Sequence, residues 1–406
     1  MKDTQIKKLI EAEKKRQKKV INLIASENYV SKDVLEALGS ELTNKYAEGY
    51  PRKRYYGGNE NIDKIEELCR KRALELFDLA EDSAGQQAGK WHVNVQPLSG
   101  SPANVAVYLA LVPPGGKIMG MSLDQGGHLT HGHKVSITGK MWVQVPYGVD
   151  KNTEIINFDE LKAKAVAEKP NIIVAGFTAY PRAIDFKKFR EVADASGAIL
   201  MVDMSHFAGL VAGKEYPSPF EYADIVTTTV HKTLRGPRSA LIFAKKDARE
   251  LDKKIDKAVF PGMQGGPHMN QVAGVAVALK EVKTPAFKKY ALQVKKNAKV
   301  LADELTKFGW RVVSGGTDSH LVLVDTWMNG EKGKNGRGAV TGKEASDRLE
   351  KAGIIVNKNA IPFDARPPAD PSGIRLGSAA ETTRGKKEKD FKKIAEKIDK
   401  VLRGEW

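Results

Sequence analysis

Short apolar segments alternate with amphipathic ones from about residue 90 to residue 245, and this alternation constrains the fold more than any other feature of the chain. Segments that are apolar along their whole length are typical of parallel strands whose sheet is covered by helices on both faces. The pattern therefore predicts an α/β fold with a mostly parallel sheet flanked by helices. The expected strands are 93–96, 117–121, 171–177, 199–203, 224–229 and 240–244, and the expected helices include 102–111, 158–168 and 186–195.

The segments on either side of this alternation predict the rest of the chain. Residues 3–24 have the apolar spacing of a helix, and a long helical region at 269–308 leads into a second, smaller α/β unit. In that unit we expect an exposed loop at 327–341, a helix at 342–352, and strands at 311–314, 320–325 and 354–357. We therefore expect three parts, namely an N-terminal helical arm at 1–30, a large domain at 31–280 and a small C-terminal domain at 281–406.

The formal net charge is +16, which by itself allows a nucleic-acid ligand. Much of the excess lies in segments 7–19 and 386–400, at the two ends of the chain. The C-terminal run has apolar residues at helical spacing among its lysines, namely Phe391, Ile394, Ile398, Val401 and Leu402. We interpret it as an amphipathic helix with a basic solvent face. No nucleic-acid motif accompanies it, so we expect anionic small molecules rather than nucleic acid as ligands.

Apolar residues make up 41% of the chain and charged residues 29%, which is typical of a globular protein. No apolar run approaches the roughly 18 residues of a membrane span, and residues 1–19 lack the apolar centre of a signal peptide. The single cysteine, Cys69, has no partner for an internal disulfide. These observations predict a cytoplasmic protein without a membrane segment.

Two motifs suggest chemistry that the surrounding residues do not support. Gly342 and Lys343 do not form a P-loop, because Arg337 occupies the position of the first glycine and Glu344 that of the Ser or Thr. The histidine-rich segment 128–133 lacks an evident carboxylate or cysteine partner, and we therefore expect no metal site there.

Two expected strands deliver reactive side chains to one edge of the sheet. The strand at 199–203 ends at Asp203, and the strand at 224–229 is followed closely by Lys232. Ligands of parallel sheets bind beyond the carboxyl ends of the strands. A partly desolvated lysine there forms Schiff bases, and an aspartate there pairs with a pyridinium nitrogen. The alternative is an ion pair of Asp203 and Lys232 that only caps the two strands.

Three further segments have the composition of anion sites. Residues 99–104 follow a strand and open a helix, which suits a phosphate, although a serine at this position is commonly just a helix cap. The glycine-dense segment 259–267 either brings backbone amides to an anion or forms a plain turn. Arg375 lies in the apolar segment 373–377 and either binds a substrate carboxylate or forms a structural salt bridge.

From about residue 5 to about residue 395, the chain resembles the serine hydroxymethyltransferase family. The resemblance implies a pyridoxal-phosphate enzyme of fold type I, with a large cofactor-binding domain and a smaller C-terminal α/β domain. The segments that carry it are NLIASENY at 22–29, LTNKYAEGYPRKRYYGG at 42–58, NVQPLSGSPAN at 94–104, GGHLTHG at 126–132, VDMSHFAGL at 202–210, TTTVHKTLRGPR at 227–238, the glycine-dense segment 259–267, and VNKN at 356–359.

The resemblance implies residues that hold the cofactor ring. Lys232 would carry pyridoxal phosphate covalently as a Schiff base, and Asp203 would hold the nitrogen of its ring. His128 would stack on the ring face. His206 and Thr178 would lie near the phenolic oxygen of the ring.

It also implies a phosphate site that two subunits share. One subunit would supply Ser99, Gly100, Ser101 and His231. The neighbouring subunit would supply Tyr46, Gly265 and Gly266, so that the protein would be a homodimer with shared active sites. Whether dimers pair into tetramers stays open.

The substrate sites are implied in the same way. Arg375 would hold the carboxylate of serine or glycine, with Ser26 and Tyr56 nearby. Glu48 would handle the proton of the serine hydroxyl and contact the folate. The pteridine of reduced folate would contact Leu123, Gly127, His128, Leu129 and Asn359.

The implied reaction is the reversible conversion of serine and tetrahydrofolate, the co-substrate, to glycine and 5,10-methylenetetrahydrofolate. The Cα–Cβ bond of serine would break, the one-carbon unit would pass to the folate, and Lys232 would release glycine in an exchange that Thr229 steers. Two alternatives stay open. One is another enzyme of the same fold, such as a threonine-type aldolase of 3-hydroxy amino acids, which would not need Glu48. The other is a basic binding protein without enzymatic activity.

Overall fold

The computed structural model describes residues 1–80, 90–331 and 336–406. The chain divides into two compact units, which we call the large unit (Asn28–Leu292) and the small unit (Met1–Glu27 with Gln293–Trp406). The first 27 residues therefore group with the C-terminal part of the chain. The expected domain boundaries at residues 30 and 280 stay predictions, because compact units need not coincide with domains.

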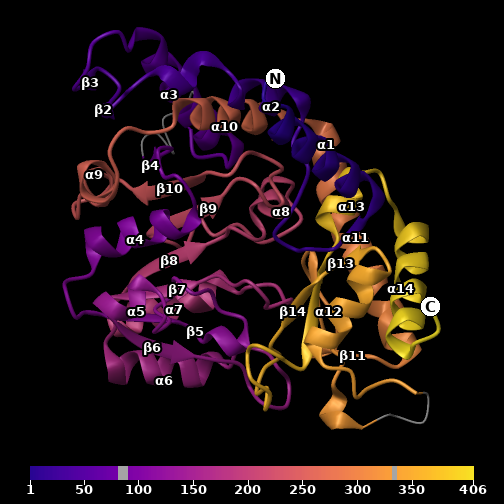
Figure 1. Cartoon of the computed structure of the whole chain (residues 1–406). Coiled ribbons are helices and arrows are strands. Elements are labelled where there is room, and N and C mark those ends of the chain that lie inside the picture. The colour runs from indigo at the N-terminus through magenta and orange to yellow at the C-terminus, as the bar shows by residue number, and fades with distance from the viewer. Residues whose placement is uncertain (81–89, 332–335) are drawn as a thin grey trace. The chain divides into compact units, whose positions relative to one another are not determined.

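A seven-stranded sheet organises the large unit, in the order β4-β10-β9-β8-β7-β5-β6 (Figure 1). The neighbours from β9 to β6 run parallel, whereas β10 is antiparallel to both strands that flank it. The sheet is mixed and mostly parallel, and helices flank it, which confirms the predicted fold class. Its strands are β4 (Trp91–Asn94), β5 (Lys117–Met121), β6 (Val143–Tyr147), β7 (Ile172–Ala175), β8 (Ile199–Asp203), β9 (Ile225–Thr229) and β10 (Ala240–Lys245).

Strand β6 is absent from the sequence prediction, and its position explains why. It forms one edge of the sheet, and its side chains alternate between exposed and buried rather than being apolar throughout. It also contains Pro146, which lacks an amide donor and is tolerated in sheets mainly at edges. A search for continuous apolar runs therefore passes over this strand.

The helices of the large unit bury apolar residues at helical spacing against the strands. Helix α7 (Phe186–Ser196) contacts β7 and β8 and buries Phe186, Phe189, Val192 and Ala193. Asp185 accepts the amide of Lys188 at its N-cap, and Gly197 ends it with a φ of 72°. Helices α4 (Gly100–Leu111) and α9 (Leu251–Lys257) share another core with the sheet. The other helices are α2 (Lys32–Leu38), α3 (Glu60–Leu76), α5 (Ile137–Met141), α6 (Phe158–Glu168), α8 (Ala208–Ala212) and α10 (Met269–Val282).

The carboxyl ends of the parallel strands meet closely around Asp203. In the pairing of β8 with β9, Asp203 lies opposite Thr227. On the other side, Gly176 follows β7, and a Cβ there would lie only 2.2 Å from the carbonyl oxygen of Asp203. Its φ of 154° also lies outside the range that most side chains adopt. The glycine therefore permits the neighbouring strand end to pack directly on the end of β8.

The helical region predicted at 269–308 consists of two helices. Helix α10 ends at Val282, and α11 (Pro285–Phe308) begins after a break of two residues. Pro285 explains the break, because proline lacks an amide donor and disfavours helical geometry in the residue before it.

The small unit contains an antiparallel sheet in the order β11-β12-β15-β14 and a separate parallel pair, β1 with β13. The strands are β1 (Ile21–Asn22), β11 (Arg311–Val312), β12 (Leu321–Asp325), β13 (Ile354–Ile355), β14 (Asn357–Asn359) and β15 (Gly373–Gly377). The helices are α1 (Thr4–Lys19), part of α11, α12 (Gly342–Lys351), α13 (Ala379–Thr383) and α14 (Glu388–Arg403).

Two local predictions in the small unit need correction. The helix expected at 3–24 ends at Lys19, because the apolar residues after it pair with β13 instead of continuing the helix. The strand expected at 354–357 is divided between β13 and β14, which belong to different sheets. The loop expected at 327–341 lies partly outside the described residues, at 332–335.

Helix α14 is amphipathic as predicted, and it buries the apolar residues that defined its pattern, Phe391, Ile394, Ile398, Val401 and Leu402. Within the part of the chain that the structure describes, no helix combines the length and the apolar character needed to span a membrane.

Candidate active site

Asp203 is buried at the end of β8, where the chain itself supplies hydrogen bonds to its carboxylate. Oδ2 accepts from Asn104 Nδ2 at 2.9 Å and from His131 Nε2 at 3.2 Å. Oδ1 accepts from the amide of Ser205 at 3.0 Å. Only 8% of the residue is exposed. The orientation of the carboxylate is therefore fixed without any ligand.

The surroundings of Asp203 favour its charged form. Burial alone would raise its pKa, because it disfavours the ionised carboxylate. The hydrogen bond from His131, the nearby charges of His131 and His128, and the hydrogen bond from Ser205 outweigh burial and hold the pKa well below its usual range. Asp203 is thus an ionised carboxylate at neutral pH and suits a ligand atom that carries a proton or a positive charge.

Asn104 connects this carboxylate to the histidine-rich segment. Its amide also donates to Thr130 Oγ1 at 2.9 Å, and its carbonyl accepts from Thr227 Oγ1 at 2.8 Å. The amide of Thr130 donates to His128 Nδ1 at 3.2 Å, and the Thr130 hydroxyl lies 2.7 Å from the same nitrogen. Because the Thr130 amide can only donate, Nδ1 of His128 acts as an acceptor in this arrangement.

The residues that follow β9 bring Lys232 and His231 to the same edge of the sheet. Lys232 is 8% exposed, and its backbone carbonyl accepts from Asn28 Nδ2 at 2.9 Å. Burial and the charges of Lys232 and Arg238 lower the pKa of His231 to about 3. His231 is therefore neutral at neutral pH. Among the described residues, its buried Nδ1 has no hydrogen-bond partner.

The N-terminus of α4 packs against the end of β9 and resembles an anion site. A Cβ added to Gly100 would lie 2.7 Å from Cγ2 of Thr229, so only glycine allows this approach. Ser99 occupies the N-cap position, but its side chain makes no capping hydrogen bond. The amides of Gly100 and Ser101 therefore lie at a helix end that no side chain caps. Such an end, with its helix dipole, favours a phosphate.

Two further predicted cofactor residues belong to the same edge. Thr178 donates from its amide to the carbonyl of Gly126 at 2.9 Å and from its hydroxyl to the carbonyl of Gly127 at 2.7 Å. His206 follows β8 and is 4% exposed, and its carbonyl accepts from Thr233 Oγ1 at 3.0 Å. Thr178 thus ties the end of β7 to the loop that precedes His128.

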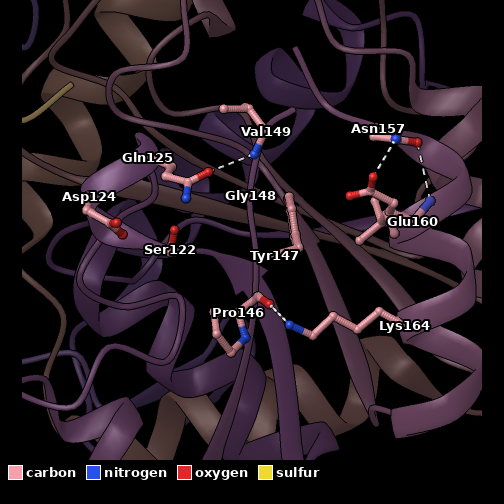
Figure 2. Close-up of a pocket in the computed structure, with 11 residues that line it drawn as sticks. Ser122, Asp124, Gln125, Pro146, Tyr147, Gly148, Val149, Asn157, Glu160 and Lys164 are labelled. Carbon is pink, nitrogen blue, oxygen red and sulfur yellow. Dashed lines mark hydrogen bonds between the residues drawn. The ribbon is translucent and has the colours of Figure 1, made fainter. Parts of the chain in front are cut away.

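This loop, residues 122–129, carries Leu123, Gly127 and Leu129 and is braced on its other side by Gln125. The Oε1 atom of Gln125 accepts from the amide of Val149 at 2.8 Å (Figure 2). A pocket of about 450 Å³ lies beside it, and Lys164 lines the pocket and donates to the carbonyl of Pro146 at 2.5 Å. The loop that carries the predicted folate residues is therefore held at its middle, at Gln125, Gly126 and Gly127, by two separate segments of the chain.

A second group of predicted residues lies on the hairpin of β2 (Gly49–Tyr50) and β3 (Lys53–Arg54) and on the glycine-dense segment. A Cβ on Gly265 would lie 3.0 Å from Glu48 Oε1, and one on Gly266 would lie 3.1 Å from Tyr46 Cε1. The rings of Tyr46 and Tyr56 meet edge to face, with centroids 5.3 Å apart. Partial desolvation and the charge of Glu48 raise the pKa of Tyr56. The structure thus gathers Tyr46, Glu48, Tyr56, Gly265 and Gly266 on one surface of the large unit.

The remaining predicted residues, Ser26, Asn359 and Arg375, belong to the small unit. Arg375 lies in the middle of β15, where its Nη2 donates to Asn357 Oδ1 at 2.8 Å. Burial lowers its pKa to about 10, which leaves the guanidinium charged at neutral pH. Asn359 lies in the neighbouring strand β14, and its side chain donates to the carbonyl of Ala360 at 2.7 Å.

The contacts of Asn104, Thr130 and His131 are absent from the sequence prediction, although a signal was present. Asn104 interrupts the otherwise apolar helical segment 102–111, and a buried amide needs partners. Its partners, however, are far along the chain and emerge only in the folded structure. Among the described residues, no three His, Cys, Asp or Glu side chains gather as metal ligands.

A sequence model of the serine hydroxymethyltransferase family matches residues 1–398 of the chain. Serine hydroxymethyltransferase of Desulfotalea psychrophila is 54% identical over 400 residues, which cover 98% of this chain and 88% of that protein. The protein of the same name from Koribacter versatilis is 52% identical over 99% of this chain and 89% of its own length. That from Wolbachia pipientis wMel is 51% identical with the same coverage of each chain.

These matches are nearly full-length on both sides, and they do not favour the alternative of an aldolase. They agree with the resemblance in sequence and with the fold. The chain therefore belongs to the serine hydroxymethyltransferase family, the pyridoxal-phosphate enzymes that transfer a one-carbon unit between serine and a folate carrier.

Proposed function

We propose that the reaction of this family, the reversible conversion of serine and tetrahydrofolate to glycine and 5,10-methylenetetrahydrofolate, takes place at the sheet edge that carries Asp203 and Lys232. The family uses pyridoxal phosphate and tetrahydrofolate. One observation carries the proposal: a buried, ionised carboxylate ends β8, and a buried lysine follows the adjacent strand β9. A pair of this kind suits an aromatic cofactor with a basic ring nitrogen and a reactive carbonyl.

Pyridoxal phosphate, when bound, supplies an electron sink for the bond that breaks at the Cα of the substrate. The residues at the edge fit this group. Lys232 would hold it covalently, Asp203 would accept the proton of the ring nitrogen, and His128 would lie against the ring. Thr178 and His206 would serve the other ring substituents. The uncapped N-terminus of α4 at Ser99, Gly100 and Ser101, together with His231, would bind the phosphate.

Thr229 has a supporting role at this edge. Its amide donates to Ser205 Oγ at 3.0 Å, and the amide of Ser205 donates to Asp203. Thr229 therefore fixes the strand end from which Lys232 extends relative to Asp203. In this way we expect it to steer the exchange of the lysine with the substrate amine.

Arg375 would bind the carboxylate of serine and glycine, with Ser26 and Tyr56 nearby. A buried guanidinium that stays charged favours an anion, because a paired charge is far less costly in a dry site than an isolated one. Such a contact orients the substrate and does not take part in bond breaking.

Glu48 would take up and return the proton of the serine hydroxyl, and the folate would lie close to it. A carboxylate at hydrogen-bonding distance from a hydroxyl acts as a general base when the Cα–Cβ bond breaks. Leu123, Gly127, His128, Leu129 and Asn359 would contact the pteridine. The bracing of loop 122–129 by Thr178 and Gln125 supports this assignment, because a flat ring needs a rigid surface.

The protein would act as a homodimer with shared sites, whether or not dimers pair into tetramers. Tyr46, Glu48, Gly265 and Gly266 would serve the cofactor of the neighbouring subunit. The exposure of this surface supports the role: Tyr46 is 55% exposed and the neighbouring Tyr56 is 44% exposed, and exposed aromatic residues commonly mark an interface. We also propose a cytoplasmic location, since the chain has a single cysteine and that cysteine is buried.

Reduction with borohydride after incubation with pyridoxal phosphate tests the assignment of Lys232. Peptide mapping should locate the reduced cofactor on this lysine, and Lys232→Ala should abolish multiple turnovers while circular dichroism shows an intact fold. Cofactor fixed on any other lysine would contradict the assignment. Glycine formation from serine that does not depend on tetrahydrofolate would contradict the proposed reaction.

A further inference from the structure

A partly buried tyrosine outside the reacting groups links the two segments that carry Glu48 and Gly265. We propose that Tyr50 is a positioning residue that holds Glu48 and the Gly265–Gly266 segment in a fixed mutual arrangement for folate-dependent chemistry. The inference rests on the role proposed above for Glu48. Tyr50 lies two residues after Glu48, at the end of β2.

The hydroxyl of Tyr50 joins three elements that are far apart in sequence. It donates to the backbone carbonyl of Asp256 in α9 at 2.6 Å and accepts from Asn94 Nδ2 in β4 at 3.0 Å. Its ring also meets that of Phe260, with centroids 6.5 Å apart and planes at 78°. Burial and the charge of Asp256 raise the pKa of Tyr50, so the hydroxyl keeps its proton and remains a donor.

Asp256, whose carbonyl accepts from the Tyr50 hydroxyl, is itself held by hydrogen bonds to its side chain. Asp256 Oδ1 accepts from His92 Nε2 at 2.8 Å and from Asn94 Nδ2 at 2.8 Å. The guanidinium of Arg70 lies 3.1 Å from His92 Nδ1. Because a guanidinium only donates, His92 Nδ1 must accept, and Nε2 carries the proton that Asp256 accepts. The end of α9 is thus tied to β4 and α3 and cannot move independently of them.

The two segments that the Tyr50 hydroxyl joins, the hairpin and the end of α9, are close in sequence to Glu48 and Gly265. On the hairpin, the carbonyl of Gly49 accepts from Gln96 Nε2 at 3.0 Å, and the carbonyl of Glu48 accepts from the amide of Tyr55 at 3.0 Å. On the other side, Asp256 precedes the turn that ends at Gly265. The Glu48 carboxylate and Gly265 are in close contact, so a shift of either segment changes the position of the carboxylate.

Removal of the hydroxyl leaves the partly buried carbonyl of Asp256 and one amide proton of Asn94 without this partner, and the hairpin is expected to shift. A misplacement of ~1 Å in a reacting group costs up to about 10²-fold in rate. Tyr50→Phe should therefore lower the kcat of folate-dependent serine cleavage by about 10- to 100-fold. Attachment of the cofactor to Lys232 should persist, because none of the edge residues contacts Tyr50 in the bonds described. A shift of Gly265 and Gly266 should lower the affinity for the cofactor in the site to which they contribute, so both activities are measured at saturating pyridoxal phosphate.

The test compares Tyr50→Phe with Tyr216→Phe. The hydroxyl of Tyr216 also bonds to the backbone of another segment, since it accepts from the amide of Ile184 at 3.1 Å and donates to the carbonyl of Arg182 at 3.1 Å. For each variant, folate-dependent serine cleavage, folate-independent cleavage of a 3-hydroxy amino acid, the affinity for tetrahydrofolate and the melting temperature are measured.

We expect only Tyr50→Phe to lower the ratio of the folate-dependent to the folate-independent rate, at least 10-fold. Loss of both activities in the same proportion, as for a variant that only destabilises the fold, would overturn the inference. So would a ratio no lower than that of Tyr216→Phe.

Hybrid dimers separate this inference from the proposed shared site. Tyr50→Phe and Lys232→Ala subunits carrying different tags are co-expressed and purified on both tags. One site of the hybrid then combines an intact Lys232 with an intact hairpin and should regain the wild-type rate per site. A parallel hybrid of Glu48→Gln with Lys232→Ala is the control.

If only the control hybrid recovers, Tyr50 does not act through the partner's site and the inference fails. If neither hybrid recovers, the shared site fails instead. The ratio of the two rates in the Tyr50→Phe homodimer then still decides whether Tyr50 positions Glu48.

Discussion

The sheet edge around Asp203 and the hairpin surface around Glu48 differ in how many of their polar side chains are buried and hydrogen-bonded within the chain. At the edge, Asp203, Asn104 and Thr130 are at most 8% exposed, and hydrogen bonds within the chain fix each of them. On the hairpin surface, by contrast, Tyr55 is 81% exposed. Tyr46 and Tyr56 on the same surface are 55% and 44% exposed.

The difference indicates that one part of the site is organised before any ligand arrives, whereas the other part is completed only by a second molecule. Buried polar groups must be paired before a ligand arrives, since an unpaired one is costly in a dry environment. The edge that we propose as the site of a permanent cofactor therefore builds its own network. Groups that act only when a second molecule closes over them remain exposed in the isolated chain, as Tyr46, Tyr55 and Tyr56 do.

The largest difference between the two regions is expected for a substitution of Glu48. Glu48→Gln keeps the size of the side chain and removes its charge, so folding and cofactor binding at the edge should persist. Folate-dependent serine cleavage should fall at least ~10²-fold, the usual contribution of a general acid–base group. Cleavage of bulky 3-hydroxy amino acids without folate should fall much less. Steady-state rates of the two reactions check this.

Equal loss of both reactions, together with a lower melting temperature, would show that Glu48 serves only to stabilise the hairpin. Contacts that stabilise the hairpin do exist in this region, and Arg54 makes several of them. Its Nη1 donates to the carbonyls of Ala47 and Gly49 at 2.9 and 2.8 Å, and its Nη2 donates to the buried Glu66 at 2.7 Å.

Much of the edge was predictable from sequence because local patterns encode it. Strand β8 is a continuous apolar run that ends at Asp203, so its position follows from the chain alone. The pairing of Asn104 with Thr227 is different, because it joins residues 123 positions apart through the packing of α4 on β9. No local pattern encodes such a contact.

The hairpin surface was predictable only through the resemblance to a family. Its strands are two residues long, which is too short for a periodic pattern, and Glu48 precedes them in a segment without apolar alternation. The contact of Glu48 with Gly265 spans more than two hundred residues. Local sequence patterns therefore encode the sheet edge but not the hairpin surface.

A substitution of His131 tests the hydrogen-bond network of the sheet edge. His131→Leu removes a hydrogen bond and an electrostatic interaction that lower the pKa of Asp203, so this pKa should rise. In the wild type, Asp203 stays ionised, and cofactor affinity should not vary with pH on its account. A hydrogen bond to a charged group contributes about 1.5–3 kcal/mol, so the variant should bind the cofactor about 10- to 150-fold more weakly.

The sign of the pH effect follows from the carboxylate. A raised pKa means that Asp203 in the variant takes up a proton as the pH falls, and it then no longer accepts the proton of the ring nitrogen. The loss of affinity should therefore grow from pH 8 towards pH 5.5 in a fluorescence titration with pyridoxal phosphate. His133→Ala, in the same segment but without a bond to Asp203, is the control. A pH-independent loss would contradict the link between His131 and the charge of Asp203.

The smallest effect is expected at Gln125, which joins the folate loop to the segment that follows β6 (Figure 2). Gln125→Ala removes the bond to the amide of Val149, while the bonds from Thr178 still hold the loop at Gly126 and Gly127. One neutral hydrogen bond contributes about 0.5–1.5 kcal/mol, so the KM for tetrahydrofolate should rise about 2- to 12-fold. The KM for serine should stay unchanged, and Lys164→Met, on the other side of the pocket, should leave both unchanged.

Gly148 provides a sharper version of the same test. A Cβ at Gly148 would lie 2.2 Å from Gln125 Oε1, so Gly148→Ala alone must displace the glutamine and should raise the folate KM as Gln125→Ala does. In the Gln125→Ala background this conflict is absent, and the added methyl group should cause no further loss. The two changes should therefore be strongly non-additive, as expected for residues in direct contact. Additive effects on the folate KM would show that the loop is held by other contacts and that Gln125 does not position it.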